Sequence, residues 1–235
     1  MTFSQMIQDG LTALNISCTA NQLALLERYA VNMSEEGVRR GLTALKNPAL
    51  LIRELIVDAV GAVPLLQQAS TIADLGSGGG TPGLPLAVML PNASLLLVES
   101  NQRKAAWIAE QIEALSLQDR VSVSTTRIEE LGRHPEHRQH YDFVVAKALA
   151  ALPALTELSL PLLKVGGSLC AYKGSKFAQE IDAAARAFQE LRGRVERIHH
   201  YSLEGMDRVI VQVTKQQPTP KAYPRRNGTP QHSPL

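Results

Sequence analysis

The chain has 235 residues, of which 45% are hydrophobic, so it is long enough to bury a substantial core in one large domain or two small ones. Its formal net charge of +2 is too small to indicate nucleic-acid binding by itself. The two cysteines, Cys18 and Cys170, match neither a disulfide framework nor a zinc motif, so we expect no metal and a reducing, cytoplasmic setting. No secretion signal opens the chain and no apolar stretch reaches membrane-spanning length, which favours a soluble protein.

The N-terminal part of the chain shows helical periodicity, for example at Leu23, Leu26, Ala30 and Met33. From Ser70 onward the pattern changes to strands that alternate with helices, which indicates a parallel α/β sheet. We therefore predict three segments. They are a helical cap over residues 1–65, an α/β domain over 66–215 and a basic C-terminal tail over 216–235.

A glycine loop follows the first predicted strand, which covers residues 71–75. Gly76, Gly78 and Gly80 lack a Cβ, so the chain can turn sharply with positive φ and its backbone can approach a ligand closely. Asp74 lies two residues before the first glycine and can accept hydrogen bonds from that ligand or brace the loop. We expect these four residues to bind a nucleoside-bearing cofactor.

The next apolar strand, over residues 94–98, ends in Glu99, whose carboxylate suits ribose hydroxyls at the same edge of the sheet. Residues 78–83 also match the dinucleotide pattern G-x-G-x-x-G, so a nicotinamide oxidoreductase is an alternative. Two prolines in this region lack the amide hydrogen that a pyrophosphate needs, and Asp74 places negative charge nearby. S-adenosylmethionine has no phosphate and carries a cationic sulfonium, so the spacing favours a methyltransferase.

Five more strands are expected over 121–124, 141–146, 168–172, 195–199 and 208–213, with helices over 83–90, 103–115 and 177–191. A long helix is expected to end near Lys164-Val165-Gly166-Gly167, where glycine is a common C-cap. The last two strands are close enough to pair in antiparallel fashion. This pattern predicts a seven-stranded, mostly parallel sheet, the Rossmann-like arrangement of class I S-adenosylmethionine-dependent methyltransferases.

Basic residues accumulate toward the C-terminus, where no acidic residue follows Asp207. They are Arg208, Lys215, Lys221, Arg225 and Arg226. The local positive field suits an anionic partner, and a solubilising tail is the alternative.

Several motifs resemble the RsmG family, also called glucose-inhibited division protein B. They are the block 73–87 with both its prolines, Arg103-Lys104, Arg127-Ile128-Glu129-Glu130, residues 160–167, Tyr172-Lys173-Gly174 and the run 223–230. The resemblance covers residues 71–235 and implies methylation of guanine N7 in 16S ribosomal RNA of the small subunit, with S-adenosylmethionine as donor. We expect the chain to act as a monomer.

The resemblance also implies roles for individual residues of the cofactor pocket. Gly76 and Thr81 would contact the methionine part and Glu99 the ribose. Ile128 and Glu129 would lie beside the adenine.

Lys147 would close this pocket after the fourth strand, where the family typically has arginine. In the cap, a family signature is reduced to Gly41-Leu42-Thr43, and a family histidine aligns with Glu54. A different RNA target and a noncatalytic RNA-binding relative are therefore further alternatives.

Guanine N7 has an in-plane lone pair and no hydrogen, so methylation needs no base, and we assign no catalytic residue. Alignment of the reactants is then the main requirement. Basic residues would hold the RNA phosphates. The candidates are Arg103, Lys104, Arg127, Lys173, Arg225 and Arg226, each of which is alternatively a solvated surface charge, or at Lys173 a strand-end support.

Overall fold

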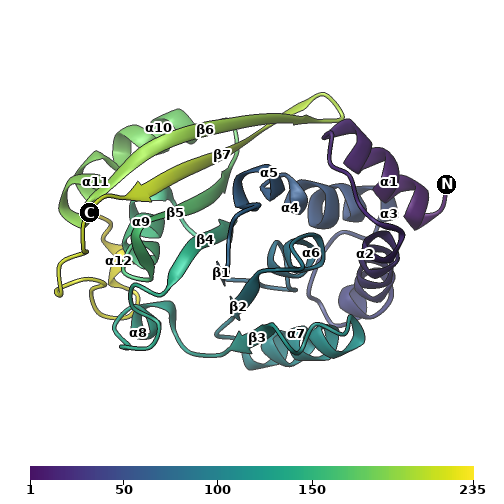
Figure 1. The fold of residues 1–235 in the computed structure, drawn as a ribbon, viewed down its shortest axis with the longest axis horizontal. Coiled ribbons are helices and arrows are strands. Elements are labelled where there is room, and N and C mark those ends of the chain that lie inside the picture. The colour runs from purple at the N-terminus through teal and green to yellow at the C-terminus, as the bar shows by residue number, and fades with distance from the viewer.

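A seven-stranded sheet with helices on both faces forms the centre of the computed structural model, which describes residues 1–235 (Figure 1). The strands are β1 (Thr71–Leu75), β2 (Ser94–Val98), β3 (Val121–Ser124), β4 (Tyr141–Lys147), β5 (Leu163–Lys173), β6 (Gly193–Leu203) and β7 (Met206–Lys215). Their order is β3-β2-β1-β4-β5-β7-β6, and β7 runs antiparallel to both β5 and β6. The prediction of a mostly parallel sheet that ends in an antiparallel pair is confirmed.

The N-terminal segment is helical. Its elements are α1 (Phe3–Ala13), α2 (Ala20–Asn32), the π-helical turn η1 (Met33–Gly37), α3 (Pro48–Leu51), the π-helical turn η2 (Ile52–Val57), α4 (Asp58–Val60) and α5 (Val63–Leu66). Helix α2 begins with a capping box, in which Thr19 and Gln22 bind each other's backbone amides. Apolar side chains such as Leu26 and Ile56 join Ile72 and Leu97 of the sheet in one hydrophobic core. The segment therefore covers one face of the sheet, and its treatment as a separate cap stays a prediction.

Side chains alternate between the two faces along each strand, as on β1, where Ile72 belongs to one core and Ala73 to the other. The helices that follow the first strands are α6 (Gly83–Met89), α7 (Gln102–Ala114) and α8 (Ile128–Leu131), and the later ones are α9 (Leu152–Ser159), α10 (Phe177–Ala183) and α11 (Ala185–Leu191). Helices α6 and α7 pack on the face that the N-terminal helices cover, whereas α8, α9 and α11 pack on the opposite face. The parallel register sets Leu75 beside Val98, so the loops after β1 and β2 begin next to each other.

The predicted glycine cap near residues 164–167 is wrong. Helix α9 ends at Ser159, and the Gly166-Gly167 pair lies inside β5. The register between β4 and β5 shifts at this place, and a Cβ on Gly167 would lie 2.8 Å from the carbonyl oxygen of Asp142. A glycine that lets two strand backbones approach closely therefore cannot be told from a glycine that caps a helix by the sequence alone.

The residues after β7 fold back beside α8 and α9 and include the short helix α12 (Thr229–His232) (Figure 1). Lys215, at the end of β7, is fully buried, and its Nζ donates to the carbonyl oxygens of Leu160 and Leu163 at 2.9 and 2.8 Å. Burial lowers its pKa to about 8. Among the helices, none combines the length and the apolar character that crossing a membrane requires.

Candidate functional site

The loop between β1 and α6 turns sharply at its glycines. Gly76, Gly78 and Gly80 all have positive φ, at +71°, +57° and +105°. At Gly76 a Cβ would in addition lie only 2.7 Å from Cδ1 of Leu149, so a larger residue would be strained by its backbone conformation and would displace that side chain. The loop therefore presents its backbone rather than side chains to the carboxyl edge of the sheet.

Asp74 braces this loop from beneath. Its carboxylate is fully buried, Oδ2 accepts a hydrogen bond from the Gly83 amide at 3.0 Å, and Ser77 Oγ donates to the Asp74 carbonyl oxygen at 3.0 Å. Burial raises the pKa of Asp74 to about 7, and the nearby charge of Glu99 acts in the same direction. Of the two roles expected for Asp74, the structure places it in the bracing one.

The N-terminus of α6 has no free amide to offer a phosphate. The Gly83 amide is taken by Asp74, the Leu84 amide donates to the Gly80 carbonyl oxygen at 2.7 Å, and Pro85 has no N–H. A Cβ on Gly83 would lie 2.6 Å from Asp74 Oδ2, so the glycine permits this close contact. The arrangement disfavours the dinucleotide alternative, which needs such amides for pyrophosphate.

Two buried aromatic side chains fix the loop through one carbonyl oxygen. Tyr29 of α2 and Trp107 of α7 both donate to the Gly79 carbonyl oxygen, each at 3.0 Å. The Tyr29 hydroxyl also lies 3.0 Å from Thr81 Oγ1. The loop is therefore held directly by an N-terminal helix and by Trp107, which is a core residue.

Glu99 extends from the end of β2 to the same loop. Its Oε2 accepts from the Gly78 amide at 3.0 Å, and its Oε1 accepts from the Asn101 amide at 2.8 Å. A carboxylate has about four acceptor positions, so both oxygens retain capacity for a ligand. The side chain is thus already oriented before any ligand arrives.

These groups border a cavity of about 450 Å³, within the usual range for small-molecule sites. The predicted cofactor residues that line it are Gly76, Gly78, Thr81, Glu99, Ile128, Glu129 and Lys147, joined by Lys104 and Arg127 from the predicted RNA-binding set. Asp74 and Gly80 do not line it. Lining residues that sequence reasoning missed include Met33, Leu42, Thr43 and Leu55 from the N-terminal segment, Leu149 after β4 and Gln231 from α12.

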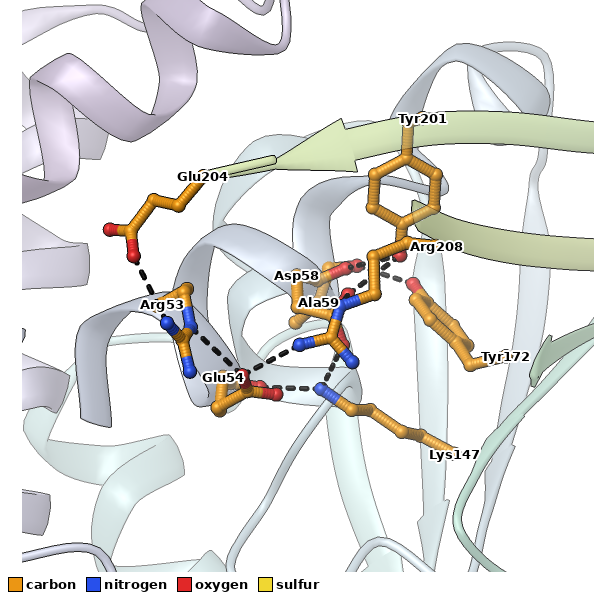
Figure 2. Close-up of polar contacts among 9 residues, drawn as sticks. All are labelled: Arg53, Glu54, Asp58, Ala59, Lys147, Tyr172, Tyr201, Glu204 and Arg208. Carbon is orange, nitrogen blue, oxygen red and sulfur yellow. Dashed lines mark hydrogen bonds and ion pairs between the residues drawn. The ribbon is translucent and has the colours of Figure 1, made fainter. Parts of the chain in front are cut away.

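A second cavity of about 490 Å³ adjoins the first, and Lys147, Ala148 and Leu149 line both. Figure 2 shows the polar network beside it. Lys147 Nζ pairs with the carboxylate of buried Asp58 and donates to the Glu54 carbonyl oxygen. The segment after β4 therefore separates two neighbouring hollows and is anchored to the N-terminal helices.

The network continues to the β6–β7 hairpin. Tyr201 donates to Asp58 Oδ1 at 2.8 Å, and Arg208 Nη2 lies 2.6 Å from Glu54 Oε1 (Figure 2). Arg53 bridges Glu54 and Glu204, at 2.9 and 3.0 Å. Burial raises the pKa of Tyr201, and its bond to Asp58 acts in the same direction. Three cations and three carboxylates balance, so this network carries no net charge.

The predicted RNA-binding residues separate into two groups. Arg103 and Arg127 are exposed, Lys104 is half-buried, and Arg226 is exposed on the tail. Lys173, in contrast, donates to the Ala150 carbonyl oxygen at 2.8 Å and pairs with Glu180 at 2.7 Å, which is the strand-end support named as its alternative role.

Arg225 likewise turns inward. Its Nη2 lies 2.6 Å from Oε2 of Glu157, a fully buried residue of α9, and its backbone amide donates to Oε1 at 2.8 Å. The pKa of Arg225 is raised by this hydrogen-bonded carboxylate. No group of three or more His, Cys, Asp or Glu side chains in the chain is arranged to hold a metal ion.

The model of one protein family, described as rRNA small subunit methyltransferase G, matches residues 22–211. The chain belongs to the rRNA small subunit methyltransferase G family. A relative of that name from Roseiflexus sp. is 36% identical over 232 residues, which cover 98% of this chain and 99% of the relative. Another, from Deinococcus radiodurans, is 41% identical over 201 residues, which cover 84% and 79%.

Solved structures agree on the fold. A SAM-dependent O-methyltransferase of Thermotoga maritima has a TM-score of 0.51 at 16% identity, covering 68% of this chain and 65% of that one. TYW2 of P. horikoshii, in complex with MeSAdo, has a TM-score of 0.53 at 16% identity, covering 68% and 62%. The predicted Rossmann-like class I methyltransferase fold is confirmed. Family membership also makes the chain a methyltransferase that uses S-adenosylmethionine, which decides against the oxidoreductase.

The first cavity fits an adenosyl ligand of this family. The loop at Gly76 and Gly78 offers a backbone surface that any Cβ-bearing residue would distort, and oriented Glu99 retains acceptors for hydroxyl groups. The apolar walls at Met33 and Leu149 suit the uncharged parts of such a molecule.

Proposed function

We propose that the chain transfers a methyl group from S-adenosylmethionine to N7 of a guanine in small-subunit ribosomal RNA. Family membership and the two adjoining cavities support this function. When bound, S-adenosylmethionine supplies a methyl group attached to a sulfonium. Gly76, Gly78 and Thr81 would hold the donor's methionine part, and Glu99 would hold its ribose.

The observation that carries the proposal is the meeting of the cavities at residues 147–149. Methyl transfer requires the nucleophile to lie next to the donor, so the target base needs a hollow that adjoins the donor's. The cations that line the second cavity, Lys147, Lys173 and Arg208, are each paired with a carboxylate of the chain, so a neutral purine suits the cavity better than a phosphate does. A base that leaves its stack could enter there.

The protein's own groups orient the reactants and do not remove a proton from the base. The carboxylate of Asp58 is paired with Lys147 and that of Glu54 with Arg208, which suits a nucleophile that has no proton to lose. Lys147 holds the segment between the cavities in place. The chemistry then depends on alignment, which requires a rigid wall between the two reactants.

The RNA phosphates would bind at the mouth of the first cavity. Arg103 and Lys104 lie at the start of α7, and Lys104 and Arg127 both line the cavity. These residues and Arg226 on the tail form our proposed phosphate contacts. Arg225 and Lys173, whose charges are paired within the chain, contribute by holding the fold.

The test uses purified protein, methyl-labelled S-adenosylmethionine and small ribosomal subunits from cells that lack the modification. We expect label in the RNA, recovered as 7-methylguanosine after digestion and chromatography, and none with subunits that are already methylated. Label in another nucleoside would establish a different target. No label, despite measured cofactor binding, would support a noncatalytic RNA-binding protein.

A further inference from the structure

The C-terminal tail is docked onto the domain by buried and charged groups. Arg225 pairs with Glu157 of α9, as described above, and its Nη2 also donates to the Ser233 carbonyl oxygen at 2.8 Å. Asn227 Nδ2 donates to Glu130 Oε1 at 2.6 Å, and Arg133 Nη2 donates to Asn227 Oδ1 at 3.1 Å. Residues 225–233 are therefore a fixed part of the structure beside α8 and α9 (Figure 1).

This docking brings α12 to the cofactor cavity. The Gly228 amide donates to Oε1 of Glu129 at 2.7 Å, and Glu129 is itself a lining residue that is only 6% exposed. The next turn buries Pro230 and places Gln231 in the cavity wall, together with Ile128 and Glu129. Because one Glu129 oxygen is taken by the tail, the carboxylate links the tail to the pocket.

We propose that Gln231 binds the adenine ring of S-adenosylmethionine. The inference rests on the cofactor cavity of the proposed function and not on the RNA target. With the ribose at Glu99, after β2, the adenine extends toward α8, where Ile128 and Glu129 line the cavity that Gln231 of α12 also lines.

The chemistry of the side chain suits this role. An amide has donors and an acceptor on one plane, and glutamine matches the donor–acceptor edge of adenine in two hydrogen bonds. The Gln231 side chain is exposed and its amide makes no hydrogen bond within the chain, whereas the neighbouring Glu129 carboxylate does. A free amide in the wall beside the adenine end is therefore available to recognise the base.

Isothermal titration with S-adenosylhomocysteine tests the proposal without RNA. Gln231→Ala should weaken binding about 5- to 10-fold, the effect of one or two net hydrogen bonds. Gln231→Glu keeps the length but loses the donor and should weaken binding as well. The matched control is Gln217→Ala, because Gln217 is an exposed glutamine of the same tail that does not line the cavity.

A second ligand tests whether Gln231 contacts the adenosine part of the cofactor. 5′-Methylthioadenosine has the adenine and the ribose but no amino-acid part, so Gln231→Ala should weaken its binding by the same factor. An affinity of Gln231→Ala within twofold of the Gln217→Ala control, for either ligand, would overturn the proposal. Titrating Glu99→Ala in parallel shows which assumption has failed. If both Glu99→Ala and Gln231→Ala bind normally, the assignment of the cavity to the cofactor is wrong. If Glu99→Ala binds weakly and Gln231→Ala binds normally, only the role of Gln231 is wrong.

Discussion

Replacing Asp74 with asparagine should remove a pH-dependent loss of stability and leave cofactor binding intact. The Asp74 carboxyl is fully buried, and its Oδ1 has no hydrogen-bond partner. Burial raises its pKa from 3.8 to about 7, so the folded chain keeps this group protonated where the unfolded chain ionises it. Asparagine has nearly the same shape, cannot ionise, and can still accept the bond from the Gly83 amide.

The sign and size follow from the two pKa values. The stability that protonated Asp74 contributes is fully present below pH 3.8 and is lost as pH rises through about 7, where the folded chain also ionises. The interval between these pKa values corresponds to about 4 kcal/mol. The Asp74→Asn variant lacks this loss. The free energy of unfolding of the variant, minus that of the natural chain, should therefore rise by about 4 kcal/mol between pH 4 and pH 8.

Urea unfolding of both chains at closely spaced pH values measures this difference, and titration with S-adenosylhomocysteine at pH 7.5 measures binding. We expect the two stability curves to diverge with pH and the two affinities to agree within about twofold. Stability curves that stay parallel from pH 4 to pH 8 would refute the reasoning. A tenfold loss of affinity with unchanged stability would instead place Asp74 in contact with the cofactor.

Three further substitutions test the site and the tail. Glu99→Ala should weaken S-adenosylhomocysteine binding by about 1–3 kcal/mol in titration calorimetry, and unchanged affinity would remove Glu99 from the site. Arg225→Ala should lower the free energy of unfolding in urea by about 3 kcal/mol, because it leaves the buried Glu157 carboxylate unpaired, and a loss below about 1 kcal/mol would contradict that role. Arg226→Ala should keep stability but reduce the salt dependence of RNA binding by about one phosphate contact, and an unaltered salt slope would exclude Arg226 from the interface.

The strands and the glycine loop were predictable because local signals determine them. The apolar run of residues 71–75 and the glycines after it predict a strand and a turn whatever packs around them, and the structure has both at these positions. The Gly166-Gly167 pair was misread because glycine marks both helix ends and close approaches of two strands. Only the pairing of β4 with β5 distinguishes these cases, and that pairing is not local.

The positions and partners of the charged side chains were less predictable from the sequence. Lys215 and Arg225 both belong to the basic residues that accumulate toward the C-terminus, yet one donates to carbonyl oxygens in the core and the other pairs with buried Glu157. Glu54, which departs from the family pattern, pairs with Arg208 of β7, a residue 154 positions away. Such partners are set by tertiary contacts, so a list of charges cannot separate free cations from paired ones.

The part of the cavity wall that the N-terminal segment forms could likewise not be predicted from the sequence. Met33 belongs to a helical pattern that fits any packed surface, and nothing local points it or Leu42 toward the glycine loop. Gln231, by contrast, follows directly on a run that carried the family resemblance. That proximity is the one signal that pointed to it.

The position of β7 between β5 and β6 has a consequence for biosynthesis. Until residues 206–215 have been made, β5 presents an open row of backbone donors and acceptors over residues 168–173, the part that pairs with β7. Open strand edges of this kind invite pairing with other chains, so nascent or truncated forms that stop before β7 are exposed to aggregation. Strand β7 thus protects the edge of β5, which is made earlier. Binding of the nascent chain by chaperones should therefore fall sharply once β7 has inserted.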